Sequence, residues 1–189
     1  MRDDSITILI DSREQLPYKF TLVESRIKYV HKKTVHLETG DYSVEICGAT
    51  GNKQRIAIER KTLADLYTTL TGNRRRFIRE AERMKEYGYA AIVIEADMLA
   101  IHDPNAHLDH PTRASPASIF GTLFALSERY NIAIWTCPNR EFAEIVTLRL
   151  LERWHRDIND GDHAFAKIAM TNPESKPRTV SLRQQGRSA

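Results

Sequence analysis

The sequence predicts an α/β fold, a mixed sheet of about six strands flanked by helices on both faces. Two patterns support this prediction. Short apolar runs recur along the chain and end at polar or turn-forming residues, as strands do. After residue 60 these runs alternate with longer amphipathic segments, an order typical of sheets covered by helices. The run at 90–95 is almost entirely apolar, which indicates a strand buried on both faces.

The first part of the chain predicts an antiparallel meander. The apolar run at 7–11 ends at Asp11, and apolar and polar residues alternate at 34–38. Gly40 and Asp41 mark a turn before the next strand pattern. The four strands expected in this part span residues 7–11, 34–38, 42–46 and 55–59.

The second part predicts four helices and two strands. Thr62, Asn73 and Asn139 have side chains that can cap the first turn of a helix. Pro116 suits a first turn because its fixed φ matches the helix. We expect an exposed polar loop at 101–115. The expected helices are 62–70, 73–87, 116–130 and 139–156, and the expected strands are 90–95 and 132–135.

Length and composition predict one domain with a tail. A chain of 189 residues with 41% hydrophobic residues is long enough to bury a core. We assign residues 1–157 to the domain. Residues 158–189 are polar and basic, and we expect them to form a disordered tail. Two cysteines, Cys47 and Cys137, are too few for a disulfide framework and favour a reducing compartment.

Hydropathy and charge give further expectations. No apolar run is long enough to cross a membrane, and the N-terminus lacks the apolar core of a signal peptide. We therefore expect a cytoplasmic protein without a membrane partner, associated with the nucleoid in a bacterial or phage setting or nuclear in a eukaryote. The net charge of +3 resides in residues 171–189. Overall charge is thus weak evidence for binding to nucleic acid, and that evidence must come from local clusters of basic residues.

Glu59, Arg60 and Lys61 form the most informative run in the chain. They directly follow the apolar residues 56–58, where three charges add nothing to a core and are costly to bury unpaired. A carboxylate that holds a metal, a lysine that orients water and an arginine that binds phosphate would explain the run. In an extended strand, Glu59 and Lys61 lie on one side and Arg60 on the other. The run therefore predicts metal-assisted phosphodiester chemistry.

Two further carboxylates, Asp11 and Asp41, lie at the ends of neighbouring predicted strands. With Glu59 they could hold a cation that prefers oxygen ligands, and Mg²⁺ suits two or three carboxylates because it keeps several waters. We therefore predict a Mg²⁺ site at these three residues, in which Mn²⁺ can substitute. A simpler interpretation stays open, because Asp41 follows Gly40 and could serve only in a turn.

Other charges near this run also allow two interpretations. Asp65 could hold Lys61 or a metal-bound water, or it could be an exposed helical charge that pairs with Lys61. Arg60 could anchor local structure or bind a flanking phosphate. The predicted helix 73–87 is crowded with arginines on one face, which could follow a DNA backbone or form a solvated surface. The DNA-binding residues that we predict are Arg13, Arg74, Arg75, Arg76, Arg79 and Arg83.

Three short motifs resemble the nuclease domain of the XPF family of structure-selective endonucleases. They are Asp-Ser-Arg-Glu at 11–14, Gly-Asp-Tyr at 40–42 and Ile-Glu-Arg-Lys-Thr-Leu-Ala-Asp at 58–65. The resemblance extends over residues 5–155. It implies a restriction-endonuclease-like fold and a metal-dependent endonuclease that cuts branched, flapped or single-strand-containing DNA in repair or recombination.

The resemblance also implies roles for the residues of the motifs. Asp41 and Glu59 match the metal ligands, Asp11 is a third acidic member, and Lys61 matches the catalytic lysine. The catalytic positions that the resemblance implies are Asp11, Asp41, Glu59, Arg60, Lys61 and Asp65.

Larger members of this family carry a helicase or a tandem helix-hairpin-helix module, which often supplies branch recognition and dimerisation. This chain ends too soon after its last predicted helix for such a module, so we expect the nuclease domain to stand alone. The expected partners are DNA and either a second copy or a heteromeric subunit that supplies branch recognition. Two alternatives stay open: a non-catalytic DNA-binding or dimerisation module of the same fold, and the nuclease subunit of a larger repair complex.

Overall fold

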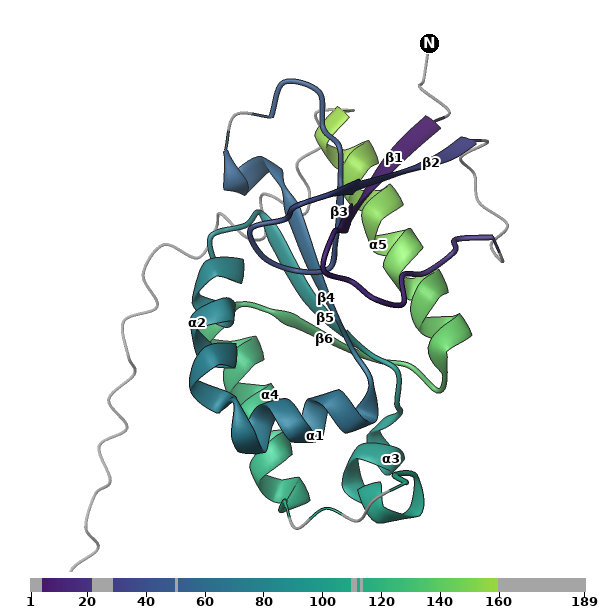
Figure 1. The fold of residues 1–189 in the computed structure, drawn as a ribbon. Coiled ribbons are helices and arrows are strands. Elements are labelled where there is room, and N and C mark those ends of the chain that lie inside the picture. Colours follow the sequence, from purple (N-terminus) through teal and green to yellow (C-terminus); the bar gives the residue numbers. More distant parts are fainter. Residues whose placement is uncertain (1–4, 22–28, 50, 110–111, 113, 160–189) are drawn as a thin grey trace, which may run out of the picture.

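The computed structural model describes residues 5–21, 29–49, 51–109, 112 and 114–159 (Figure 1). These residues cover most of the span that we assigned to the domain. The tail expected at 158–189 lies almost entirely outside the described residues. Within the described part of the chain, no helix is both long and apolar enough to span a membrane.

Six strands form one mixed sheet. They are β1 Ser5–Asp11, β2 Tyr29–Val35, β3 Tyr42–Val44, β4 Ile56–Lys61, β5 Tyr89–Ile94 and β6 Ala133–Thr136. Their order across the sheet is β2-β1-β3-β4-β5-β6. The pairs β1–β3 and β3–β4 are antiparallel, and the pairs β1–β2, β4–β5 and β5–β6 are parallel. The prediction of a mixed sheet of about six strands is confirmed.

The predicted antiparallel meander is wrong at the second strand. That strand lies at Tyr29–Val35 rather than 34–38, and it runs parallel to β1 at the edge of the sheet. Most of its side chains are exposed, including those of Lys32 and Lys33. Lysines on an edge strand oppose association with other sheets, but they also hide the alternation by which a half-buried strand is identified.

Helices cover both faces of the sheet, as predicted. They are α1 Leu63–Gly72, α2 Arg74–Met84, α3 Met98–His102, α4 Pro116–Tyr130 and α5 Arg140–Asn159, with 3-10 turns at Asn52–Gln54 and Pro104–Ala106. α1, α2 and α4 lie on one face of the sheet, and α5 lies on the other (Figure 1). Alternate residues of β4 enter the two cores, because Ala57 packs with the α1, α2 and α4 layer whereas Ile56 and Ile58 pack with α5.

Two of the three predicted helix caps are confirmed. The Thr62 side chain accepts a hydrogen bond from the backbone N–H of Asp65, and Asn139 Oδ1 accepts one from Phe142 N at 2.8 Å. Asn73 precedes α2 but makes no side-chain capping bond, and its φ of −118° and ψ of 22° are not extended. Because α1 ends immediately before it, Asn73 closes one helix while opening the next, and the predicted capping geometry does not form.

The segment 101–115, expected as a loop, contains local structure. The segment begins in the last residues of α3 and continues into the 3-10 turn at Pro104–Ala106. The first turn of α3 is capped by Asp97 Oδ1, which accepts a hydrogen bond from Ala100 N at 2.8 Å. Ile101 and Pro104 are buried. These turns are too short to show a helical period in the sequence, which explains why the loop prediction missed them.

Candidate active site

Asp41 is fixed between β1 and β4 by backbone contacts. Gly40 before it has a φ of +75°, in the left-handed region that favours glycine. A Cβ added at Gly40 would lie 3.1 Å from the carbonyl oxygen of Ile58, so the chain passes close to β4. The Asp41 N–H donates to Ile58 O at 2.8 Å, and Asp11 N donates to Asp41 O at 2.8 Å. The Asp41 side chain then accepts a hydrogen bond from Arg60 N at 2.7 Å.

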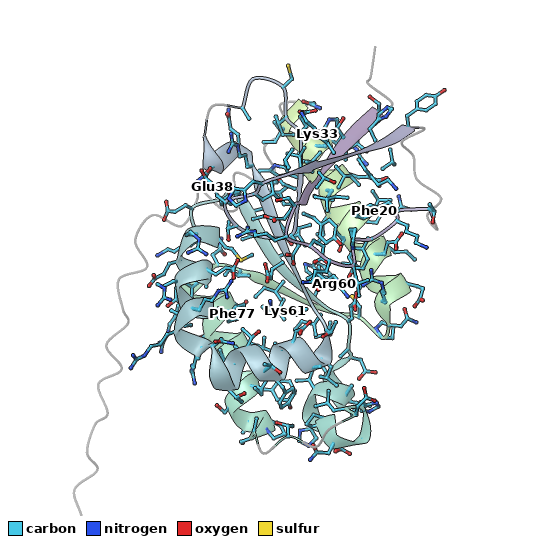
Figure 2. All side chains as sticks on the ribbon, viewed as in Figure 1. Phe20, Lys33, Glu38, Arg60, Lys61 and Phe77 are labelled. Atoms are coloured by element: carbon cyan, nitrogen blue, oxygen red, sulfur yellow. The ribbon has the colours of Figure 1, made fainter. Side chains whose placement is uncertain are left out.

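Glu59 and Lys61 lie on the same face of β4, as the spacing in the strand predicts. Lys61 Nζ lies 2.6 Å from Glu59 Oε1, and both side chains are largely buried. The Lys61 ammonium also lies 5.6 Å from the centroid of the Phe77 ring, in the space between the sheet and α2 (Figure 2). The candidate site is therefore built where the end of β4 meets α2.

The burial of two neighbouring carboxylates shifts their pKa values. Burial and then the charge of Glu59 raise the pKa of Asp41 to about 8. Burial also raises the pKa of Glu59, although the Lys61 ammonium opposes that shift. Burial acts to lower the pKa of Lys61, but the charge and hydrogen bond of Glu59 outweigh it and raise that pKa. When Asp41 and Glu59 are both ionised, the single charge of Lys61 does not balance them, and a cation bound beside them would supply further positive charge.

Two adjoining hollows, of about 290 Å³ and about 280 Å³, open over these residues. The first hollow also reaches Glu14 and Asp65, and the second also reaches Arg76 and Glu80. The residues that line both hollows are Arg13, Asp41, Glu59 and Lys61. Two of the three predicted metal-binding carboxylates, Asp41 and Glu59, therefore line the same adjoining hollows as the predicted lysine and part of the predicted DNA-binding set.

The sequence prediction missed Glu14 and Glu80 as neighbours of the site. Glu80 lines the second hollow, and its charge helps to raise the pKa of Glu59, after burial. It lies four residues after Arg76 and therefore on the same face of α2, which is the signal that could have identified it. Glu14 belongs to the motif at 11–14, but its contact with the site depends on the path of the loop after β1.

The Asp11 carboxylate is hydrogen-bonded within the loop that follows β1 and to the segment after β2. Its carboxylate accepts hydrogen bonds from Arg13 Nε at 2.8 Å and Nη2 at 2.6 Å, and from the backbone N–H groups of Arg13 and Leu37. Burial acts to raise the pKa of Asp11, but these bonds and the Arg13 charge outweigh it and lower the pKa. The structure therefore brings Asp41 and Glu59 together and holds the Asp11 carboxylate in a separate set of contacts.

These contacts bear on the predicted metal site. Across the residues that the structure describes, no group of three or more Asp, Glu, His or Cys side chains is placed to hold a metal ion. Two carboxylates nevertheless fit Mg²⁺ or Mn²⁺, because such ions commonly retain water ligands and use few protein carboxylates. Asp41 and Glu59 are the residues that would hold the metal.

Arg60 lies on the opposite face of β4 from Lys61 (Figure 2). Its side chain is 10% exposed, with Nε 2.7 Å from Glu95 Oε1 and Nη1 3.2 Å from Glu14 Oε1. Of the two interpretations of Arg60, these contacts agree with the one in which it anchors local structure.

Asp65 is exposed in the first turn of α1 and lines the first hollow. Its Oδ2 accepts a hydrogen bond from Thr62 Oγ1 at 2.8 Å. Lys61 donates a hydrogen bond to Glu59 in the same strand, in place of the predicted pairing with Asp65. Asp65 therefore lies at the border of the site as part of a helix cap.

α2 presents a basic surface beside the site. Its Phe77, Ala81 and Met84 are buried against the core, which leaves the other side of the helix in solvent. Arg76 lines the second hollow, and Arg13 lines both hollows although it pairs with a carboxylate. The exposed arginines of α2 are Arg74, Arg75, Arg76, Arg79 and Arg83. The predicted DNA-binding residues of this helix therefore form a surface that reaches the candidate site.

The site and fold can be compared with known proteins. The structure is similar to that of XPF from Aeropyrum pernix, with a TM-score of 0.58 and 21% identity over 83% of this chain and 69% of that one. XPF from Aeropyrum pernix in complex with DNA is similar with a TM-score of 0.53 and 19% identity, over 82% of this chain and 66% of that one. This chain thus spans about two thirds of the length of those structures. No curated protein matches it.

At these identities the solved structures show a shared fold. A family model provides the stronger finding, because the ERCC4 domain matches residues 10–148. The matched segment contains β4, the Gly40 turn and the whole of α2. The chain belongs to the ERCC4 domain family, the family of the XPF endonucleases.

Proposed function

We propose that this chain is a metal-dependent endonuclease that hydrolyses phosphodiester bonds in DNA. The observation that carries the proposal is the accessible hollow in which Asp41, Glu59 and Lys61 meet. Membership of the ERCC4 family supports the reaction class. When bound, Mg²⁺ or Mn²⁺ would polarise a phosphoryl oxygen and promote deprotonation of a water.

Each residue of the hollow has a property that suits this reaction. The pKa of Lys61 is raised, so its ammonium stays protonated where it can neutralise charge on a phosphoryl group or orient a water. Contacts with Glu59 and the Phe77 ring fix the position of that ammonium. The Gly40 turn holds Asp41 against β4, so that both carboxylates are in place before a metal binds.

Metal binding is expected to depend on pH. Because the pKa of Asp41 is raised to about 8, its carboxyl group is largely protonated at pH 6, and a cation must displace that proton. Affinity for Mn²⁺ is therefore expected to rise as the pH increases from 6 to 8.5. Calorimetric titration at the two pH values measures this, with Glu59→Gln as the variant that weakens binding at both. Equal affinity at the two pH values would contradict the assignment of Asp41 as a ligand.

The arginines of α2 are suited to bind the DNA backbone. Replacing Arg76 by alanine is expected to weaken DNA binding and to reduce the slope of log K against log salt by about 1, the loss of one phosphate contact. Fluorescence anisotropy at several salt concentrations measures that slope. Arg149→Ala is the matched control, because this residue lies on α5 on the other face of the sheet. The same slope in both variants would exclude Arg76 from the DNA surface.

The proposed substrate is branched, flapped or single-strand-containing DNA. The family resemblance supports this preference, and a similar solved protein is described in complex with DNA. The test is a panel of end-labelled duplexes, flaps and forks incubated with Mg²⁺, Mn²⁺ or EDTA. We expect cutting of at least one junction-containing substrate in either metal and none in EDTA.

The same panel distinguishes the alternatives. Binding of DNA without cutting in any metal would favour a non-catalytic module of this fold. Cutting that appears only after a co-purifying protein is added would favour the nuclease subunit of a larger repair complex.

A further inference from the structure

An ionic network lies behind the candidate site, and its centre is the buried side chain of Glu95, directly after β5. Glu95 Oε1 accepts hydrogen bonds from Arg60 Nε at 2.7 Å, Tyr18 OH at 2.9 Å and Arg140 Nη1 at 3.0 Å. Its Oε2 accepts a further bond from Arg60 Nη2 at 3.1 Å. The Glu95 side chain is only 8% exposed, so these four bonds satisfy a carboxylate that water reaches poorly.

Arg140 connects this network to the loop after β1. It is the first residue of α5, and its Nη2 donates to the carbonyl oxygens of Leu16 at 2.6 Å and Pro17 at 3.4 Å. Its guanidinium carbon lies 4.8 Å from the centroid of the Tyr18 ring. One side chain thus joins the start of α5, the end of β5 and the loop that follows β1.

The charges in the network balance. Two guanidinium groups, those of Arg60 and Arg140, face two carboxylates, Glu95 and Glu14. A guanidinium with a full set of carboxylate partners has little attraction left for a DNA phosphate. The network is therefore better suited to hold structure than to bind substrate.

We propose that Glu95 and Arg140 are positioning residues that act on the site through Arg60. They hold the Arg60 side chain behind β4, and the backbone N–H of the same residue donates to Asp41 Oδ2 at 2.7 Å. Because successive side chains in a strand point to opposite faces, a clamp on Arg60 also fixes Glu59 and Lys61 in front. The inference rests on the proposed function, to which it adds two residues, Glu95 and Arg140, that line neither hollow of the site.

The test is the variant Arg140→Ala, assayed below its melting temperature. We expect kcat to fall by about 10- to 100-fold, the usual effect of removing a group that orients an active-site residue. KM for DNA is expected to stay within about twofold, because Arg140 lines neither hollow of the candidate site. Its side chain is 36% exposed, so millimolar guanidinium ion should enter the gap and restore part of kcat.

Arg153→Ala is the matched control for this variant. Arg153 lies on the same helix and also pairs with a buried carboxylate, with Nε 2.8 Å from Asp157 Oδ2. The Arg153→Ala substitution is expected to lower the stability of the protein without lowering kcat. An equal loss of kcat in both variants, a change in KM alone, or no rescue by guanidinium would each overturn the proposal.

A second measurement does not depend on activity. In the ¹⁵N-labelled protein without metal, Arg140→Ala is expected to shift the amide resonance of Arg60 and to speed its exchange with solvent, whereas Arg153→Ala leaves both unchanged. If the wild-type protein cuts DNA but the Arg60 amide does not respond, the positioning role is wrong. If the amide responds but no DNA is cut in any metal, the positioning role stands and the proposed function is wrong.

Discussion

Replacing Lys61 with alanine is expected to lower the rate of DNA cleavage by about 10²- to 10³-fold, the typical loss on removing one group that stabilises transition-state charge. Lys61 Nζ is held by Glu59 at 2.6 Å inside the hollow, and its raised pKa keeps it charged. Single-turnover cleavage of an end-labelled junction in Mg²⁺ measures the effect. Saturating enzyme separates this loss from any loss of DNA affinity.

The matched control for this variant is Lys33→Ala. Lys33, on the edge strand β2, also pairs with a glutamate, Glu45, at 2.9 Å, but both side chains are about half exposed. Its removal is expected to leave the cleavage rate unchanged, because exposed ion pairs contribute little. A cleavage rate for Lys61→Ala equal to that of the control would remove Lys61 from the mechanism.

Metal binding separates the chemical role of Lys61 from a structural one. In Lys61→Ala, the Glu59 carboxylate loses a cationic neighbour that competes with a metal for the same negative charge. Mn²⁺ affinity is therefore expected to be at least that of the wild type, even though cleavage is lost. If Mn²⁺ binding disappears together with cleavage, the lysine supports the shape of the site rather than its chemistry.

The β4 part of the site could be predicted because a strand fixes the direction of each side chain. Side chains two residues apart in a strand point to the same face of the sheet. Glu59 and Lys61 therefore had to lie together, and Arg60 had to lie on the opposite face. The approach of Asp41 to Glu59 followed from the expectation that neighbouring strands meet at one edge of the sheet. These inferences depend on backbone periodicity, which the sequence contains.

The partners of these residues could not be predicted in the same way. Glu95 meets Arg60 across 35 positions of sequence, and Arg140 meets Glu95 across 45. Such contacts depend on which strands are neighbours and on how α5 crosses the sheet, and neither follows from local pattern. The contacts of Asp11 could not be predicted from local pattern either. Its position at a strand end predicted a metal ligand, but its carboxylate pairs with Arg13 in the loop that follows β1.

Replacing Gly40 with alanine is expected to impair both folding and cleavage. A left-handed φ costs an L-residue about 1–2 kcal/mol, and crowding against the β4 backbone adds to that cost, so we expect about 2–4 kcal/mol in total. The added Cβ would lie 3.1 Å from Ile58 O and 3.2 Å from Ile58 N, and these backbone atoms cannot move without moving Glu59. Chemical denaturation measures the stability, and single-turnover kinetics measure the cleavage.

Gly48→Ala separates the two causes of this effect. Gly48 has a φ of +77°, almost the same as that of Gly40, but a Cβ added there would meet no atom within 4 Å. The Gly48→Ala variant is expected to lose only the conformational part of the stability, about 1–2 kcal/mol, and to cleave DNA at the wild-type rate. Equal losses in the two variants would mean that glycine at position 40 serves the turn alone. A larger loss at Gly40, with slower cleavage, would mean that the close approach to β4 holds Asp41 beside Glu59.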